Sequence, residues 1–165
     1  MTNEEHNVET MIVEKAQAIF ARYGFRKTTM DDIAQATHKG KSTLYHYFPS
    51  KEGLFTAVIE REVKELKAEI HQALAAENDP PQKLRTYIRT RLHAFKRLAN
   101  LYQAFADEYL DNYRFIEKIR TSYDEYERMM ISNILREGVE AGLFAISDLD
   151  LIAHVIVAAS KGLEY

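Results

Sequence analysis

The 165-residue sequence has no cysteine and no tryptophan, and it contains only six glycines and three prolines. Without cysteine, a disulfide framework and thiolate chemistry are both excluded. No apolar run reaches the length of about 18 residues that a membrane-spanning helix needs, and no basic segment followed by an apolar stretch marks a secretion leader. We therefore expect a cytoplasmic protein without a membrane partner.

The residues that are abundant favour helices. Apolar residues make up 46% of the chain and charged residues 28%, a balance typical of soluble helical proteins. Apolar side chains recur at steps of three and four, and no stretch alternates as a β-strand would. These patterns predict an all-α protein.

The periodicity also predicts where the helices lie. The expected segments are about 8–23, 30–37, 41–47, 51–76, 80–99, 101–110, 113–141 and 149–163. Gly24 suits the left-handed residue that ends a helix, and Thr29 with Asp32, like Ser147 with Asp150, has capping-box spacing. The last segment is apolar almost all round, which predicts burial on more than one side. Because short helices give way to long ones near residue 50, we expect two domains, residues 1–50 and 51–165.

Positive charge is concentrated near the N-terminus. Six basic and two acidic residues lie between Arg22 and Lys51, which gives that segment a charge of +4 in a chain whose total is −3. A local basic patch is typical of a DNA-contacting face, although an ordinary solvated surface would have the same composition.

Two short helices joined by a tight turn, after one amphipathic helix, match the helix-turn-helix pattern. Leu44 and Phe48 are four residues apart and can both face the core. The residues that then point outward are Lys41, Ser42, Tyr45 and His46. Hydroxyls, a lysine and an imidazole can bind base edges and phosphates. Tyr47 could equally be a half-buried core aromatic, and spacing alone leaves DNA binding open.

Three runs of sequence carry a resemblance to a known family: Gly24-Phe25 with 28–34, then 40–48, then 50–55. Together they closely resemble the N-terminal domain of the TetR family of repressors, over about residues 8–55. The resemblance implies a repressor that responds to a small molecule and binds a palindromic operator in double-stranded DNA as a homodimer. The residues that it assigns to DNA are Thr29, Lys41, Ser42, Thr43, Tyr45, His46, Tyr47 and Lys51, and Lys39 is a further candidate.

The turn departs from the family pattern. Where the family commonly has a glycine this sequence has His38, and where it has a small apolar residue this sequence has Lys39. Lys39 is therefore either an additional phosphate contact or an adjustment in how the turn packs.

The resemblance implies that residues 51–165 form a helical ligand-binding and dimerisation domain, with a pocket for an unknown effector among its helices. Tyrosine, phenylalanine and methionine offer such a pocket apolar area with adaptability or a polar tip; plain core packing is the alternative for each of them. The candidates are Tyr87, Phe95, Tyr102, Phe105, Tyr109, Tyr123, Tyr126 and Met130. No metal and no other cofactor is expected, because the sequence has no cysteine and no paired histidines.

The end of the chain departs from the family as well. The family usually ends with two long helices that form the dimer interface, whereas this sequence has only one, at 149–163. We expect either a shortened chain or a missing last helix, which would leave residues 149–159 without part of their cover.

Two other functions compete with gene regulation. One is a helical small-molecule or protein-interaction module that does not bind DNA, against which the basic segment argues. The other is an enzyme that uses Asp107, Glu108 and a histidine as acid and base. Nothing in the sequence brings those groups together, and it has no phosphate loop or metal-ligand spacing. We expect no enzymatic activity.

Overall fold

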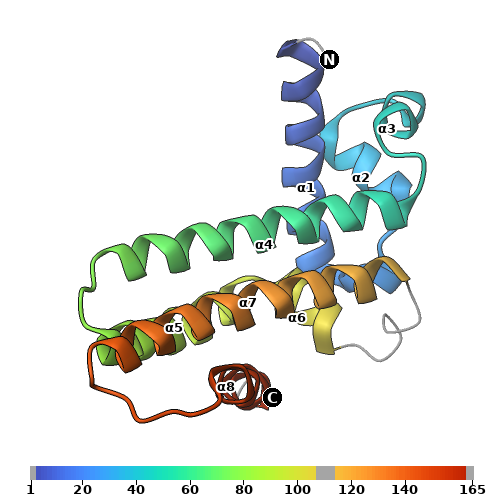
Figure 1. Cartoon of the computed structure of the whole chain (residues 1–165). Coiled ribbons are helices and arrows are strands. Elements are labelled where there is room, and N and C mark those ends of the chain that lie inside the picture. Colours follow the sequence, from blue (N-terminus) through green and yellow to red (C-terminus); the bar gives the residue numbers. More distant parts are fainter. Residues whose placement is uncertain (1–2, 107–113, 163–165) are drawn as a thin grey trace.

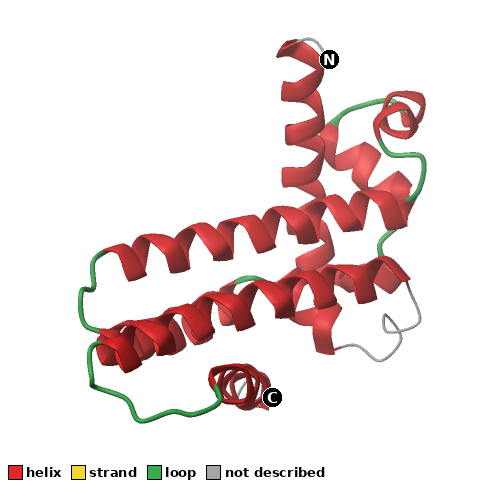
Figure 2. Cartoon of the chain, in the orientation of Figure 1, coloured by secondary structure: helices red, strands yellow, loops and turns green. Residues whose placement is uncertain are grey.

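The computed structural model describes residues 3–106 and 114–162. Within these ranges the chain forms helices and no strand (Figure 2), which confirms the predicted all-α fold. The helices are α1 (Asn3–Lys27), α2 (Met30–Thr37), α3 (Lys41–Tyr47), α4 (Lys51–Ala75), α5 (Pro80–Arg97), α6 (Ala99–Ala106), α7 (Arg114–Glu140) and α8 (Leu149–Gly162). None of the helices in these ranges offers the uninterrupted apolar length that a bilayer crossing would require.

The helices fall into two groups that α4 connects (Figure 1). The helices α1, α2 and α3 lie together at one end of α4, and we call them the DNA-reading unit after the function that the sequence predicts for them. From there α4 runs alongside α5 and α7, and α6 packs against both α1 and α4. The helices α5 to α8, with the far part of α4, are called the sensing half after the ligand site that the sequence predicts there. Helix α8 packs on α7 and is seen end-on in Figure 1, so the two cross steeply.

An aromatic cluster joins the DNA-reading unit to α4. The ring of Phe55, on α4, lies 4.9 Å from that of Phe20 and 4.8 Å from that of Phe25, both on α1. All three side chains are buried. Edge-to-face and tilted ring pairs add specific attraction to the burial of large apolar areas. The start of α4 is therefore packed rigidly against α1.

The predicted end of the first helix at Gly24 is confirmed, whereas the predicted start near residue 8 is wrong, because the helix begins at Asn3. Gly24 has a left-handed φ of 78°, which makes a kink, and helical structure resumes as far as Lys27. The chain can continue because Thr28 satisfies the carbonyl of Gly24 twice, through its backbone N–H at 3.3 Å and its hydroxyl at 2.9 Å. The glycine thus redirects the chain toward α2.

The predictions for α8 need two corrections. Its N-cap is Asp148, not Ser147, because the carboxylate of Asp148 accepts the backbone N–H of Leu151 at 2.9 Å. The predicted burial on more than one side is also wrong, since Leu151 is 57% and Val155 51% exposed. One face of α8 packs on α7, and no other part of the described chain covers the opposite face.

Candidate nucleic-acid interface

The start of α2 is fixed by a reciprocal cap that matches the predicted capping box. Thr29 has extended backbone geometry, and its Oγ1 accepts the N–H of Asp32 at 3.2 Å. The hydroxyl and the backbone N–H of Thr29 both donate to Asp32 Oδ2, at 2.6 and 2.8 Å. These hydrogen bonds lower the pKa of Asp32 below its ordinary value. Thr29, a predicted phosphate contact, is exposed, but its hydroxyl already serves the cap.

The turn between α2 and α3 is short and left-handed. His38 has a φ of 53°, and its backbone N–H donates to the last carbonyls of α2. A residue with a Cβ is disfavoured in this region by about 1–2 kcal/mol, which gives a physical reason for the glycine common in the family. The hydroxyl of buried Thr37 donates to the carbonyl of Ile33 at 2.9 Å and closes the end of α2. The turn therefore holds the two short helices at a fixed angle.

The orientation of α3 agrees with the prediction. Leu44 is completely buried and Phe48 nearly so, which anchors one face of the helix in the core. The residues on its exposed face are Lys41, Ser42, Tyr45 and His46, and Tyr45 is 46% exposed. Tyr47 is half-buried against the core, with its ring 5.2 Å from that of His46. Thr43 is half-buried as well. The arrangement presents a row of donors and acceptors on a rigid, short helix.

An ion pair links the two short helices at the surface. Lys41 Nζ lies 2.6 Å from Asp31 Oδ2, and both side chains are largely exposed. The hydrogen bond and charge of Asp31 raise the pKa of Lys41 above its ordinary value. Because water screens an ion pair as exposed as this one and makes it weak, a phosphate can compete with Asp31 for this ammonium group.

Lys51 is half-buried and bonded to the backbone near the kink, a role that the sequence did not suggest. Its Nζ donates to the carbonyls of Phe25 and Thr28, at 2.9 and 3.1 Å, and lies 4.4 Å from the centroid of the Phe25 ring. These carbonyls are available because the kink at Gly24 turns the chain past the start of α4. Ser50 caps α4 by accepting the N–H of Gly53 at 3.0 Å. A phosphate contact through Lys51 stays a prediction.

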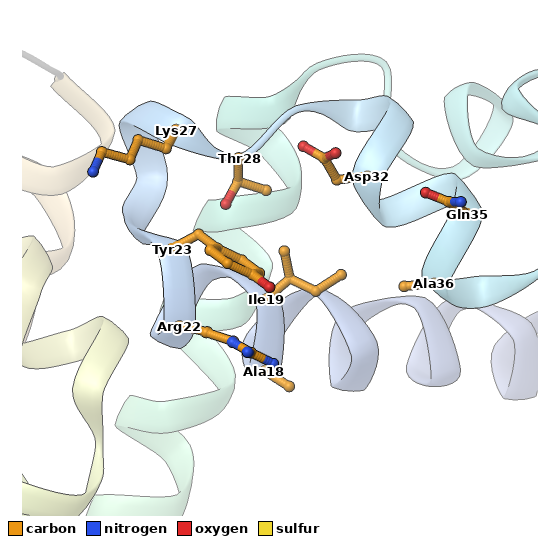
Figure 3. A pocket seen from close by; sticks show the side chains of 9 residues that line it. All are labelled: Ala18, Ile19, Arg22, Tyr23, Lys27, Thr28, Asp32, Gln35 and Ala36. Carbon is orange, nitrogen blue, oxygen red and sulfur yellow. The ribbon is translucent and has the colours of Figure 1, made fainter.

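A hollow of about 650 Å³ lies between α1 and α2 on the DNA-reading unit (Figure 3). Tyr23 and Ile19 point into it from α1, and Asp32 and Gln35 border it on α2. Arg22 lies over the ring of Tyr23, with its Cζ 5.2 Å from the centroid. Arg22, at the edge of the hollow, therefore adds a positive charge to this end of the molecule.

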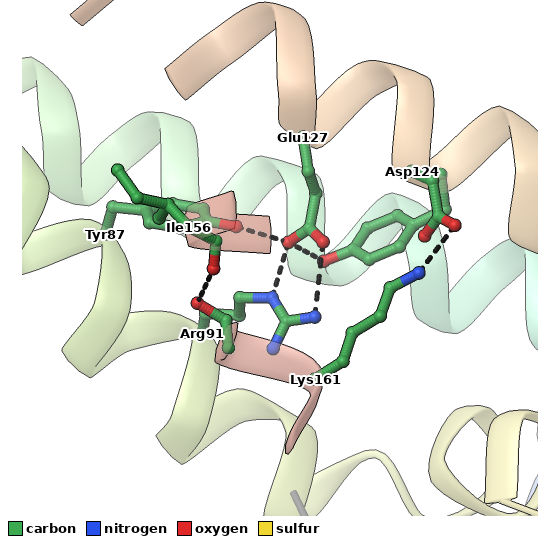
Figure 4. Close-up of polar contacts among 8 residues, drawn as sticks. Tyr87, Arg91, Asp124, Glu127, Ile156 and Lys161 are labelled. Atoms are coloured by element: carbon green, nitrogen blue, oxygen red, sulfur yellow. Dashed lines mark hydrogen bonds and ion pairs between the residues drawn. The ribbon is translucent and has the colours of Figure 1, made fainter. Parts of the chain in front are cut away.

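In the sensing half, two of the predicted pocket residues surround a buried ion pair (Figure 4). Arg91 Nε donates to Glu127 Oε1 at 2.6 Å, and both side chains are at most 1% exposed. The hydroxyls of Tyr87 and Tyr123 donate to the same oxygen, at 2.6 and 2.9 Å. Burial, followed by the charge of Glu127, raises the pKa of Tyr123 well above its ordinary value. No sequence signal singled out Arg91 or Glu127.

Two other predicted pocket residues lie elsewhere. Tyr126 and Met130 border a groove of about 480 Å³ between α4 and α7, together with His71 and Leu74. Lys67 Nζ stands 4.2 Å from the centroid of the Tyr126 ring. The predicted set is therefore divided between a buried cluster and an open groove. Tyr109, Asp107 and Glu108 lie outside the described residues, as do the side chains of Phe95, Tyr102 and Phe105.

A three-helix unit with an exposed second short helix is the architecture of helix-turn-helix DNA-binding regulators. The family described as bacterial regulatory proteins, tetR family, matches residues 12–58. A solved transcriptional regulator from Cytophaga hutchinsonii superimposes with a TM-score of 0.81 at 31% identity, covering 93% of this chain and 78% of that one. The chain belongs to the TetR family of bacterial regulatory proteins.

Curated relatives extend the similarity well beyond the matched segment. The HTH-type transcriptional regulator YhgD of Bacillus subtilis is 25% identical over 151 residues, which cover 89% of this chain and 77% of the relative. The HTH-type transcriptional repressor KstR2 of Mycobacterium tuberculosis is 28% identical over 150 residues, covering 88% and 74%. The chain is accordingly a DNA-binding transcriptional regulator with a helix-turn-helix domain and a helical C-terminal part.

Proposed function

We propose that this regulator is a repressor that binds a palindromic DNA operator as a homodimer and releases it when a small molecule binds. The observation that carries the proposal is the outward face of α3, where Lys41, Ser42, Tyr45 and His46 stand exposed on a helix anchored by Leu44. In this proposal α3 enters the major groove and its side chains contact base edges, with Thr29, Lys39, Thr43, Tyr47 and Lys51 at the surrounding bases and phosphates. The proposal of repression follows KstR2, whose name identifies it as a repressor, although FasR of Mycolicibacterium smegmatis, also 28% identical, is named as an activator.

The exposed apolar face of α8 supports the homodimer. Leu151 and Val155 lie one helical turn apart, and each is more than half exposed. Contiguous apolar surface on a soluble protein marks an interaction site, and pairing with the same face of a second copy would cover it. Such a dimer can hold two recognition helices about 34–36 Å apart, the distance between successive major grooves on one side of DNA.

The response to a small molecule would run through α4. This helix begins at the boundary of the two proposed domains, residues 1–50 and 51–165, and its far end borders the groove with Tyr126 and Met130. The groove has a volume in the range of small-molecule sites, about 300–1,000 Å³. A ligand that wedges α4 from α7 would tilt α4 and change the separation of the recognition helices in the dimer. Both operator contacts would then weaken together.

The DNA contacts are tested with the double variant Tyr45→Ala/His46→Ala. A duplex is first selected from a random library with the unaltered chain, and binding is then compared between that duplex and a scrambled one. Each lost base contact should cost about 1–3 kcal/mol on the selected duplex, so the preference for it should disappear. The circular dichroism of the helices should stay unchanged, because both side chains are exposed.

The matched control is His93→Ala/Met129→Ala, which removes an exposed histidine and an exposed large apolar side chain from α5 and α7, outside the DNA-reading unit. It should keep the preference for the selected duplex. If the α3 double variant also kept it, α3 would not be the recognition helix. If no duplex were selected at all, a helical module that does not bind DNA would be the better description.

A further inference from the structure

Glu62 is a buried carboxylate in the middle of α4, at the place where α1, α4 and α6 meet. Its side chain is 1% exposed. Removing a charged carboxylate from water is costly unless hydrogen bonds replace its hydration. A residue of this kind therefore indicates a specific arrangement of donors around it.

Three donors from two helices supply that arrangement. Gln17 Nε2, on α1, and Asn100 Nδ2, on α6, donate to Glu62 Oε1 at 3.1 and 2.7 Å. The backbone N–H of Leu101 donates to Glu62 Oε2 at 2.7 Å. Asn100 Nδ2 also donates to the backbone carbonyl of Gln17 at 3.1 Å. One carboxylate on α4 thus holds the DNA-reading unit and the first turn of α6 at once.

The bond to Leu101 ties Glu62 to backbone as well as to side chains. Leu101 is in the first turn of α6, where N–H groups have no partner within the helix. The positive end of the helix dipole also favours an anion there. The first turn of α6 therefore cannot move relative to α4 without either breaking this bond or moving α4 with it.

We infer that Glu62 is the positioning residue that couples α6 of the sensing half to the DNA-reading unit. The inference rests on the proposed function, and it identifies the connection through which a change in the sensing half reaches α1. Coupling between two sites is reciprocal. Operator binding at the DNA-reading unit must therefore stabilise the first turn of α6, and it must do so through Glu62.

The variant Glu62→Gln is a sharp test because glutamine has nearly the same shape but only one acceptor oxygen. All three groups that face Glu62 are donors, so the new NH₂ group must oppose at least one of them. Asn100 Oδ1 has no hydrogen-bond partner and could accept from that NH₂ group if the Asn100 amide turned over. Turning it would place Oδ1 against the carbonyl of Gln17, so the network cannot be restored.

The experiment measures amide hydrogen exchange of the full chain with and without the duplex selected from a random library. In the unaltered protein, duplex binding should slow exchange in α6 by about fivefold or more, the lower end of typical couplings. In Glu62→Gln this slowing should be lost, and affinity for the duplex should fall by about the same factor. The control Glu65→Gln, an exposed residue of the same helix that pairs with Arg61, should retain both.

Three results would overturn the inference. The first is a folded Glu62→Gln that binds the duplex and still slows exchange in α6 as the unaltered chain does. If Glu62→Gln fails to fold, the variant Gln17→Met is used instead, because it removes only the α1 donor and leaves the bond from Leu101 to Glu62. The second overturning result is a Gln17→Met protein in which duplex binding slows exchange in α6 as much as in the unaltered chain. If no duplex is selected, the proposed function fails separately. The inference can then still be tested in the free protein, where Glu62→Gln should speed exchange in both α1 and α6. Faster exchange in α6 alone is the third result that would overturn it.

Discussion

At the scale of single residues, the buried ion pair of Arg91 and Glu127 should dominate the stability of the sensing half. Replacing Glu127 with alanine leaves the guanidinium of Arg91 buried without its counter-charge and removes the acceptor of Tyr87 and Tyr123. Loss of one partner of a buried pair typically costs about 3–5 kcal/mol. We expect a loss of this size in the free energy of unfolding, measured by urea denaturation followed by circular dichroism.

The matched control is Glu137→Ala, on the same helix, where the glutamate pairs with Lys83 at the surface. Exposed pairs contribute about 0–1 kcal/mol, so this variant should unfold almost like the unaltered chain. Equal losses in the two variants would mean that the sensing half relaxes around Arg91 and that the buried pair is not a fixed part of the core.

Polar contacts between residues that are close in the sequence could be predicted, whereas those between distant residues could not. The cap of Thr29 on Asp32 involves residues three positions apart, so its spacing is visible in the sequence. Glu127 and its partner Arg91 lie 36 positions apart, and Glu62 meets Asn100 across 38. Glutamate and arginine are rarely buried, so nothing local marks such residues as core groups. Only the packing of the helices brings them together.

At the scale of whole helices, the sequence predicts a helix end correctly where residues close to that end in the chain fix it. The helices α2 and α3 begin and end at the predicted residues, because a cap and a tight turn bound them. The first long helix ends at Gly24 as predicted, and Thr28 closes the short helical segment beyond the kink. For α8, Ser147 and Asp148 are adjacent and both have side chains that can cap a helix. Which of them caps α8 depends on how the preceding loop approaches the helix.

The apolar face of α8 gives a prediction at this scale. The double variant Leu151→Glu/Val155→Glu should convert the proposed dimer to a monomer in sedimentation velocity. A fully buried aliphatic side chain contributes about 1.5–3 kcal/mol, and each 1.4 kcal/mol is about tenfold in affinity. The dimer dissociation constant should therefore rise by about a hundredfold or more. Met129→Glu, an equally exposed apolar position on α7, should leave the association unchanged; dimers that survive the α8 change would place the interface elsewhere.

At the scale of the whole molecule, positive charge is concentrated in one segment of an otherwise acidic chain. The segment from Arg22 to Lys51 carries six basic and two acidic residues, +4, so the rest of the chain carries −3 − 4 = −7. Residues 1–21 carry four glutamates and one lysine, −3, so residues 52–165 carry −7 + 3 = −4. The segment from Arg22 to Lys51 is therefore attracted to DNA, while the acidic remainder of the chain is repelled by it. This polarity favours the approach of the molecule to DNA with α3 leading, and it makes binding sensitive to salt.

Lys39 tests whether the turn takes part in that attraction. If its ammonium group contacts a phosphate, Lys39→Ala should weaken binding to selected and scrambled duplexes alike, and the slope of log affinity against log salt should become shallower by about one. Fluorescence anisotropy over a range of salt concentrations measures both quantities. Lys64→Ala removes an exposed lysine of α4 from the acidic remainder of the chain and should leave the slope unaltered. A Lys39 that only adjusts the packing of the turn would instead change the unfolding free energy and keep the slope, because no counterion release would be lost with it.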